Sequence, residues 1–136
     1  PSDIWAVGAS GTILHYTGSG WSTVTPSPTT AVLLAVHGSS AKDVWAVGSG
    51  GTVLRYDGSG WQTRPSNTLS TLNGVWAASP SDVWVTTSGG PIRHFDGVAW
   101  ADVEIGNPAY MYGIWGANAS EIWAVGNSGT LLHYRK

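Results

Sequence analysis

The sequence predicts an all-β fold: a β-propeller built from four-stranded antiparallel blades. Three observations predict it. A segment centred on a tryptophan recurs along the 136-residue chain at offsets of 40, 39 and 39 residues. Each repeat contains four short runs of β-branched and aromatic residues, and Gly, Ser, Asn or Asp bound these runs. A repeated all-β unit of this length is typical of propeller blades, about 3.5 of which fit in the chain.

The most regular segment is the second strand of the repeat, position B. In residues 43–48 it reads Asp-Val-Trp-Ala-Val-Gly, and closely similar segments occupy residues 3–8, 82–87 and 121–126. In a strand, alternate side chains point to opposite faces, so Trp45 and Val47 share one face while Val44 and Ala46 share the other. We therefore expect the tryptophans, including Trp45 and Trp84, to pack between blades.

Three further strands complete the repeat. Their composition and their Gly- or Asp-containing boundaries are typical of short strands. Position A is predicted at residues 33–37, 72–76 and 111–115. Position C is predicted at residues 12–16, 52–56, 91–95 and 130–134. Position D begins at Trp21, Trp61 and Trp100.

The links between the strands predict a meander. Residues 48–51 join B to C and residues 57–60 join C to D, and their glycines supply the positive φ angles that tight hairpins require. The D-to-A segments are longer, as in residues 63–71, and contain Pro and polar residues. We expect them to cross from one blade to the next, on the same side of the disc as the B–C turns.

The chain length predicts one domain, a single propeller segment over residues 1–136. Its strand order reads B-C-D, A-B-C-D, A-B-C-D, A-B-C. The expected division is a partial blade 1–30, blades 31–70 and 71–110, and a partial blade 111–136. An unclosed ring would expose tryptophan-rich blade faces, and soluble monomers rarely expose apolar patches of that size. We expect oligomerisation, most simply a homodimer, to close the ring; a fragment of a longer protein and a compact four-bladed monomer are the alternatives.

The motifs resemble a known group of repeats. Gly-Val-Trp at residues 74–76, the strand at 43–48, Gly-Thr-Val-Leu at 51–54 and Asp-Gly at 57–58 before Trp61 are similar to Trp-rich bacterial propeller repeats. These are grouped as WD40/YVTN/BNR-like and include propellers of the photosystem II assembly factor type. The resemblance runs through the whole chain and implies a propeller.

The resemblance does not imply catalysis. The Asp-box of sialidase-like repeats is only approximated by residues 57–61, and Thr17 replaces the Asp in the first repeat. Six Lys and Arg scattered over repeat positions do not supply a sialidase arginine triad. A Ser-His-Asp order, a nucleophile elbow and a phosphate loop are also absent from the sequence. We therefore predict that the protein is not an enzyme and has no cofactor.

Composition excludes several classes of partner. The formal net charge is −2, without the basic cluster that nucleic acid or an anionic membrane would attract. Cysteine is absent, which excludes disulfides and cysteine-based metal sites. The histidines lack metal-ligand spacing, so no metal site is predicted. The cellular compartment stays open, with a secreted or cell-surface bacterial location favoured.

The recurring polar residues are expected to be structural. His15, His94 and His133 share one position of strand C with Arg55, where packing or an edge role is the expected one. The acidic residues that begin strand B are expected to accept hydrogen bonds from amides of the A–B turn. They are Asp3, Asp43, Asp82 and Glu121.

The predicted function is that of a non-catalytic binding module. The D–A segments differ most between repeats, and variable loops on a rigid scaffold are where recognition usually occurs. Aromatic residues beside polar ones favour a glycan as the ligand, in a lectin-like role. The alternatives are a protein-binding scaffold or assembly-factor propeller, and a propeller fragment with no ligand of its own. The candidate ligand-binding residues are Asn67, Asn107, Tyr110, Tyr112, His37, Trp76 and Trp115.

Overall fold

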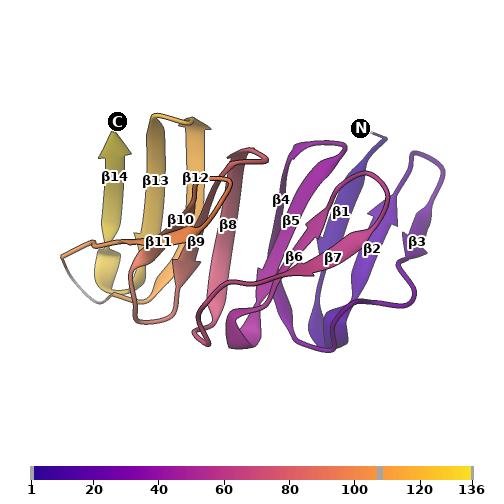
Figure 1. Ribbon diagram of the computed structural model, residues 1–136, viewed down its shortest axis with the longest axis horizontal. Helices are drawn as coiled ribbons and strands as arrows, with labels where there is room; N and C mark the ends of the chain where they lie inside the picture. The colour runs from indigo at the N-terminus through magenta and orange to yellow at the C-terminus, as the bar shows by residue number, and fades with distance from the viewer. Residues whose placement is uncertain (1, 107–108, 136) are drawn as a thin grey trace.

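The computed structural model describes residues 2–106 and 109–135, which form fourteen strands in four antiparallel sheets (Figure 1). The first sheet contains β1 (Ile4–Val7), β2 (Ile13–Tyr16) and β3 (Trp21–Thr23). The second contains β4 (Leu33–Ser40), β5 (Asp43–Gly48), β6 (Val53–Tyr56) and β7 (Trp61–Arg64). The third contains β8 (Leu72–Ser79), β9 (Asp82–Thr87), β10 (Ile92–Phe95) and β11 (Trp100–Val103). The fourth contains β12 (Met111–Asn118), β13 (Glu121–Gly126) and β14 (Leu131–Arg135).

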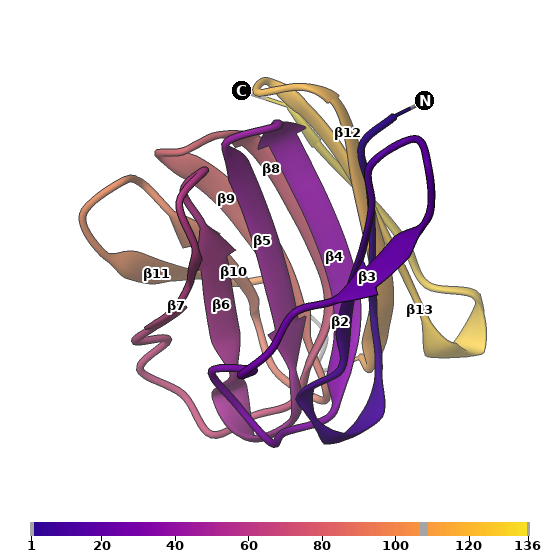
Figure 2. The same ribbon diagram turned by 90° about the vertical axis from the view of Figure 1, so that its right-hand side faces the viewer.

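The sheets are propeller blades. Strands pair in chain order within each sheet, so the predicted meander and the predicted strand order are confirmed. The sheets stand side by side along an arc (Figure 1), and β4, β8 and β12, the A strands, are neighbours from blade to blade (Figure 2). The 3-10 turns Ala9–Gly11, Ser49–Gly51 and Asn127–Gly129 join B to C in the first, second and fourth sheets.

The B–C turns and the D–A crossings meet on one side of the arc, the lower side in Figure 1. Gly11 donates its main-chain N–H to the carbonyl of Ala31 at 2.8 Å, which ties the first B–C turn to the following crossing. In the second sheet, Gly51 has a φ of +70°, and a Cβ added there would lie 1.9 Å from the carbonyl oxygen of Thr68. We call this side of the arc, with its turns and crossings, the loop face.

The hydrophobic core lies between the sheets rather than within any one of them. Trp45, Val47 and Val53 of the second sheet pack against residues of the third, among them Val83 and Val85. Two equivalent clusters join the first sheet to the second and the third to the fourth. Trp45 is 1% exposed. The prediction that these tryptophans pack between blades is confirmed.

The aromatic contacts recur with similar geometry at successive interfaces. The ring of Trp45 lies 5.6 Å from that of Phe95 and 6.5 Å from that of Trp100. Trp5 meets Tyr56 and Trp61 of the second sheet at 4.9 and 5.2 Å. Three of the B-strand tryptophans, Trp5, Trp45 and Trp84, therefore contact the C strand, and where present the D strand, of the following blade.

Replacing Trp45 by Ala should lower the free energy of unfolding by about 3–5 kcal/mol, the usual cost of truncating a large buried aromatic side chain. Val98→Ala is the control, because Val98 in the C–D hairpin of the third blade is 89% exposed, and the variant should lose about 1 kcal/mol or less. Urea denaturation followed by circular dichroism measures both. An unchanged transition midpoint for Trp45→Ala would contradict the packing described here.

Gly51→Ala should also destabilise the fold, by roughly 2 kcal/mol or more. A residue with a β-carbon is strained at this positive φ, and the β-carbon would also clash with the carbonyl oxygen of Thr68. The control is Gly50→Ser. Gly50 has a φ of +62° and open space around it, and the equivalent residues Ser10 and Ser128 already adopt φ of 53° and 52°. Thermal melts of the two variants should therefore differ clearly, and equal melting temperatures would count against the close approach at Gly51.

Candidate binding face

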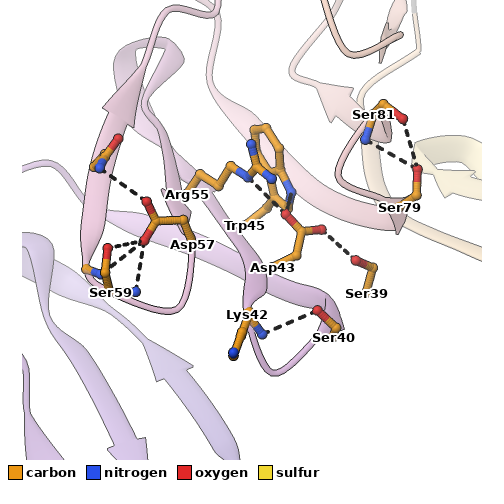
Figure 3. Close-up of polar contacts among 12 residues, drawn as sticks. Ser39, Ser40, Lys42, Asp43, Trp45, Arg55, Asp57, Ser59, Ser79 and Ser81 are labelled. Atoms are coloured by element: carbon orange, nitrogen blue, oxygen red, sulfur yellow. Dashed lines mark hydrogen bonds and ion pairs between the residues drawn. The ribbon is translucent and has the colours of Figure 1, made fainter.

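The acidic residue at the start of strand B contacts a strand-C side chain in each blade, and Figure 3 shows the resulting polar cluster around Asp43 in the second blade. Asp43 is 1% exposed, and its Oδ1 accepts hydrogen bonds from the indole N–H of Trp45 at 3.1 Å and from Nε of Arg55 at 2.9 Å. Its Oδ2 accepts from the hydroxyl of Ser39 at 2.5 Å. The expectation that Asp43 accepts from turn amides is therefore wrong. The buried indole N–H of Trp45 needs an acceptor, and Asp43 supplies it while also pairing with the half-buried Arg55.

The histidines of strand C take the place of Arg55 in the other blades. His94 lies 2.9 Å from a carboxylate oxygen of Asp82, which also accepts from the indole of Trp84 at 2.7 Å. His15 and His133 contact Asp3 and Glu121 in the same way, at 2.6 and 3.2 Å. Their rings stack on the tryptophans, with centroid distances of 3.8 Å for Trp5–His15 and 3.7 Å for Trp123–His133.

The carboxylates of the C–D hairpins build turns. Asp57 accepts hydrogen bonds from the hydroxyl and amide of Ser59 and the amide of Gly60, which together lower the pKa of Asp57 to about 2. Asp96 accepts from the amides at positions 98 and 99, and its pKa is lowered for the same reason. Within residues 2–106 and 109–135, no group of three His, Cys, Asp or Glu residues could hold a metal ion.

The loop face exposes a row of side chains from the A strands. The pairing of A with B skips one residue near the start of each A strand, at Leu34, Asn73 and Tyr112. Such bulges redirect a side chain out of the regular alternation. Leu34 is 46% exposed and Tyr112 is 56% exposed, whereas the residues that precede them in β4 and β12 are buried. Because β4, β8 and β12 are neighbours, the three bulged residues form one row across three blades.

Asn73 holds the middle of this row in place. Its Nδ2 donates to the hydroxyl of Ser88 at 2.9 Å and to the carbonyl of Met111 in the next blade at 2.8 Å. Its Oδ1 accepts from Ser88 at 3.2 Å. Both amide hydrogens are thus used within the protein, and one lone pair of Oδ1 has no donor among the residues that the structure describes.

Exposed apolar residues continue the row onto the crossings. Val32 is 43% exposed, Leu69 89% and Tyr110 49%. The ring of Tyr110 lies against the B–C turn of the third blade, since a Cβ added to Gly89 would be 3.5 Å from its Cζ. Charge is sparse here: the three crossings, residues 24–32, 65–71 and 104–110, contain Glu104 as their one charged residue in the sequence. The opposite side carries the A–B and C–D turns with their carboxylates.

The seven residues predicted to bind a ligand do not form one site. Tyr110 and Tyr112 both lie on the loop face. His37 accepts a hydrogen bond from the amide of Ala77 at 3.1 Å, burial lowers its pKa, and it helps to join the second and third sheets. Trp76 is 5% exposed and belongs to the core between the third and fourth sheets, whereas Trp115 is exposed on the far side of the fourth sheet.

The two asparagines lie elsewhere. Asn67 is exposed, with a φ of +57°, and lines a separate cavity together with Arg64 and Trp100. Asn107 lies outside the described residues. Sequence reasoning missed Leu34 and Asn73. The available signal was that residues 34, 73 and 112, equivalent positions in otherwise regular repeats, carry three different side chains.

The fold is shared with solved structures of low sequence identity. A structure described as YCF48 bound to D1 peptide matches with a TM-score of 0.81 and 17% identity, over 100% of this chain and 49% of that one. YCF48 from Cyanidioschyzon merolae matches with a TM-score of 0.76 and 16% identity, over 98% of this chain and 50% of that one. The computationally designed Ika4 protein matches with a TM-score of 0.76 and 16% identity, over 99% of this chain and 86% of that one.

The chain thus spans about half the length of the two YCF48 chains. No protein-family model matches the sequence, and no curated protein matches it either. In the part of the chain that the structure describes, no helix is long and apolar enough to cross a membrane. The similarity at this level of identity establishes the fold, and the fold is the predicted β-propeller with its likeness to photosystem II assembly factor-type propellers.

Proposed function

We propose that this chain is a non-catalytic protein-recognition segment that binds an uncharged, extended peptide with its loop face. The observation that carries the proposal is the row of bulged residues Leu34, Asn73 and Tyr112 on three neighbouring strands, in which a half-buried Asn73 lies between the exposed Leu34 and Tyr112. Exposed apolar side chains gathered around fixed polar groups are typical of interaction surfaces.

The chemistry of the row favours a peptide. Leu34 and Tyr112 offer apolar and aromatic contacts on either side of Asn73, whose remaining Oδ1 lone pair suits a main-chain N–H. The near absence of charge on the crossings favours a neutral segment, because a charged one would lose hydration without gaining a partner. The similar fold of YCF48, which was solved bound to a D1 peptide, supports this class of ligand.

A lectin-like function has less support. Repeated glycan sites would require the same side chains at equivalent positions of several blades. The equivalent loop-face positions instead carry Leu, Asn and Tyr, and the aromatic candidates Trp76 and Trp115 differ completely in exposure. A single asymmetric surface fits one extended protein segment better.

Tyr112→Ala should weaken peptide binding at least tenfold, the loss expected when a central aromatic contact is removed. Peptides selected from a random twelve-residue phage library against the wild-type chain serve as probes, with affinity measured by calorimetry. Lys42→Ala, on the opposite side, is the control and should leave the affinity unchanged.

Two outcomes would overturn this proposal. One is a set of selected peptides whose affinity is the same for wild type and Tyr112→Ala. The other is binding on a glycan array that Tyr112→Ala abolishes while no peptide is enriched.

We also propose that the chain self-associates through its two outer blade faces. On the fourth sheet, Val125 and Leu131 are 48% and 61% exposed, whereas their equivalents Val47 and Val53 are fully buried. On the first sheet, Trp21 is 52% exposed, although the equivalent tryptophans of β7 and β11 pack against the preceding blade. The outer face of the fourth sheet thus resembles one side of an interface between neighbouring blades, and the outer face of the first sheet resembles the other side.

Light scattering at micromolar concentration should give twice the 14.2 kDa mass of the chain. The double variant Val125→Asp, Leu131→Asp should give the single mass with its fold retained, because two carboxylates cannot be buried unpaired at an apolar interface. A wild-type mass of 14.2 kDa with a cooperative melt would refute self-association and favour the monomer.

A further inference from the structure

A cavity of about 310 Å³ lies between the second and third sheets, at their outer strands. Both sheets have all four strands, so the cavity belongs to an interface between complete blades. Its lining includes three aromatic and three polar side chains: Trp45, Phe95, Trp100, Arg55, Arg64 and Asn67. Sites for small molecules are usually apolar pockets of this size or larger that contain a few polar groups.

Arg64 distinguishes this cavity from the equivalent places in the molecule. It is exposed at the end of β7, in the position that Val103 takes in β11 and Val24 takes in the first blade. Within residues 2–106 and 109–135, every other arginine pairs with a carboxylate, and Arg64 has no such partner. The second blade therefore places a positive charge in the cavity where the first and third blades have an apolar side chain.

The neighbouring charges do not cancel that of Arg64. Arg55 is paired with Asp43 at 2.9 Å, so two arginines less one aspartate leave the cavity with a net positive charge. Asp96 precedes the lining residue Gly97, but its carboxylate accepts hydrogen bonds from the amides at positions 98 and 99 and is directed into its own turn. The cavity thus favours an anion.

Asn67 adds a second donor beside Arg64. Its φ of +57° is a left-handed conformation that asparagine adopts more readily than most residues. The equivalent residue of the first crossing is Pro28, which has no side-chain donor. Both donors of the second blade therefore stand where the first blade has none.

We propose that this cavity binds a small aromatic monocarboxylate. The carboxylate pairs with the guanidinium of Arg64, whose planar fork matches the two carboxylate oxygens, and accepts a further hydrogen bond from the amide of Asn67. The aromatic ring of the ligand packs against Phe95 and Trp100. The site is separate from the loop face, since neither Leu34 nor Tyr112 lines it.

The aromatic wall favours a ring as the body of the ligand. Phe95 and Trp100 are half-buried, and their rings lie 5.3 Å apart with an interplanar angle of 40°. Two tilted rings with free surface offer a third ring both face and edge contacts, which stabilise aromatic pairs beyond the burial of apolar area. An aliphatic acid of the same charge would lose these contacts.

The charge of the cavity favours a carboxylate over a phosphate. A phosphate ester carries about −1.5 to −2 charges at neutral pH, more than the one unpaired guanidinium of Arg64 balances. The excess negative charge would lie near Asp43 and Asp96, which repel it. A single carboxylate leaves no such excess.

The test is a titration of the ¹⁵N-labelled full chain with 3-phenylpropionate at neutral pH, followed by NMR at the indole N–H of Trp100. This signal should shift saturably. 3-Phenylpropionamide lacks the charge and propionate lacks the ring, and each should bind about tenfold or more weakly, as expected when one of two principal contacts is lost. The proposal is overturned by the absence of a saturable shift, by equal affinity for the acid and the amide, or by tighter binding of phenyl phosphate.

Variants of Arg64 assign the charge to this residue. Arg64→Val should keep the fold, because Arg64 is exposed and valine occupies its place in two other blades, and should weaken binding of 3-phenylpropionate about tenfold or more. Arg64→Lys keeps the charge without the fork and should give an intermediate affinity. Lys42→Ala removes a positive charge that does not line the cavity and is the control. Equal affinities of the wild type and Arg64→Val would refute the assignment.

Discussion

The tryptophan of strand B is the interaction on which the rest of the structure depends. A sheet of three or four short strands is marginal alone, so each blade needs a neighbour to bury its faces. The indole N–H of Trp45 is bonded to Asp43, and Arg55 lies over its ring with Cζ 5.2 Å from the centroid. The ring is therefore fixed within its own blade, and the next blade packs against a rigid surface. Similar ring geometries at all three interfaces place successive blades along an arc.

This arrangement separates the two sides of the arc. The carboxylates of Asp43 and Asp82, which accept hydrogen bonds from the indoles of Trp45 and Trp84, begin β5 and β9, at the end of the blade where the A–B and C–D turns lie. The loop face, at the other end, takes no part in fixing the indole. A bulge there can redirect Leu34 or Tyr112 outward without moving Trp45 or its equivalents, because the register is restored within one residue. The scaffold thus tolerates variation on the loop face alone, which is the condition for a recognition surface.

Much of this fold was predictable because the signal recurs. Residues 43–48 and their equivalents predicted the strands and the strand faces that pack between blades. The glycines of the hairpins predicted the connectivity. The bulges were not predictable, since alternation shows which face a side chain occupies but not that one residue is unpaired. The hydrogen-bond partners of Asp43 could not be predicted from the sequence either. An aspartate before a strand can accept from turn amides or from side chains, and only the pairing of β5 with β6 brings Arg55 within reach.

The candidate sites were harder to predict because they lie where one blade departs from the repeat. Thr86 is fully buried where Val7, Val47 and Val125 stand in other blades, and its hydroxyl has no hydrogen-bond partner among the described residues. Nothing in the structure explains that exchange.

The exchange of Leu54 for Arg93 is different, because Thr63 changes to Asp102 with it and Arg93 also donates to the carbonyl of Ser66 in the preceding crossing. Blades with identical grooves would let the D strand of one blade pair with the C strand of another. The pair of Arg93 and Asp102 disfavours such mispairing. Either residue in the groove of another blade would leave a charge without its partner. The same exchange makes the groove of the third blade chemically distinct from that of the second.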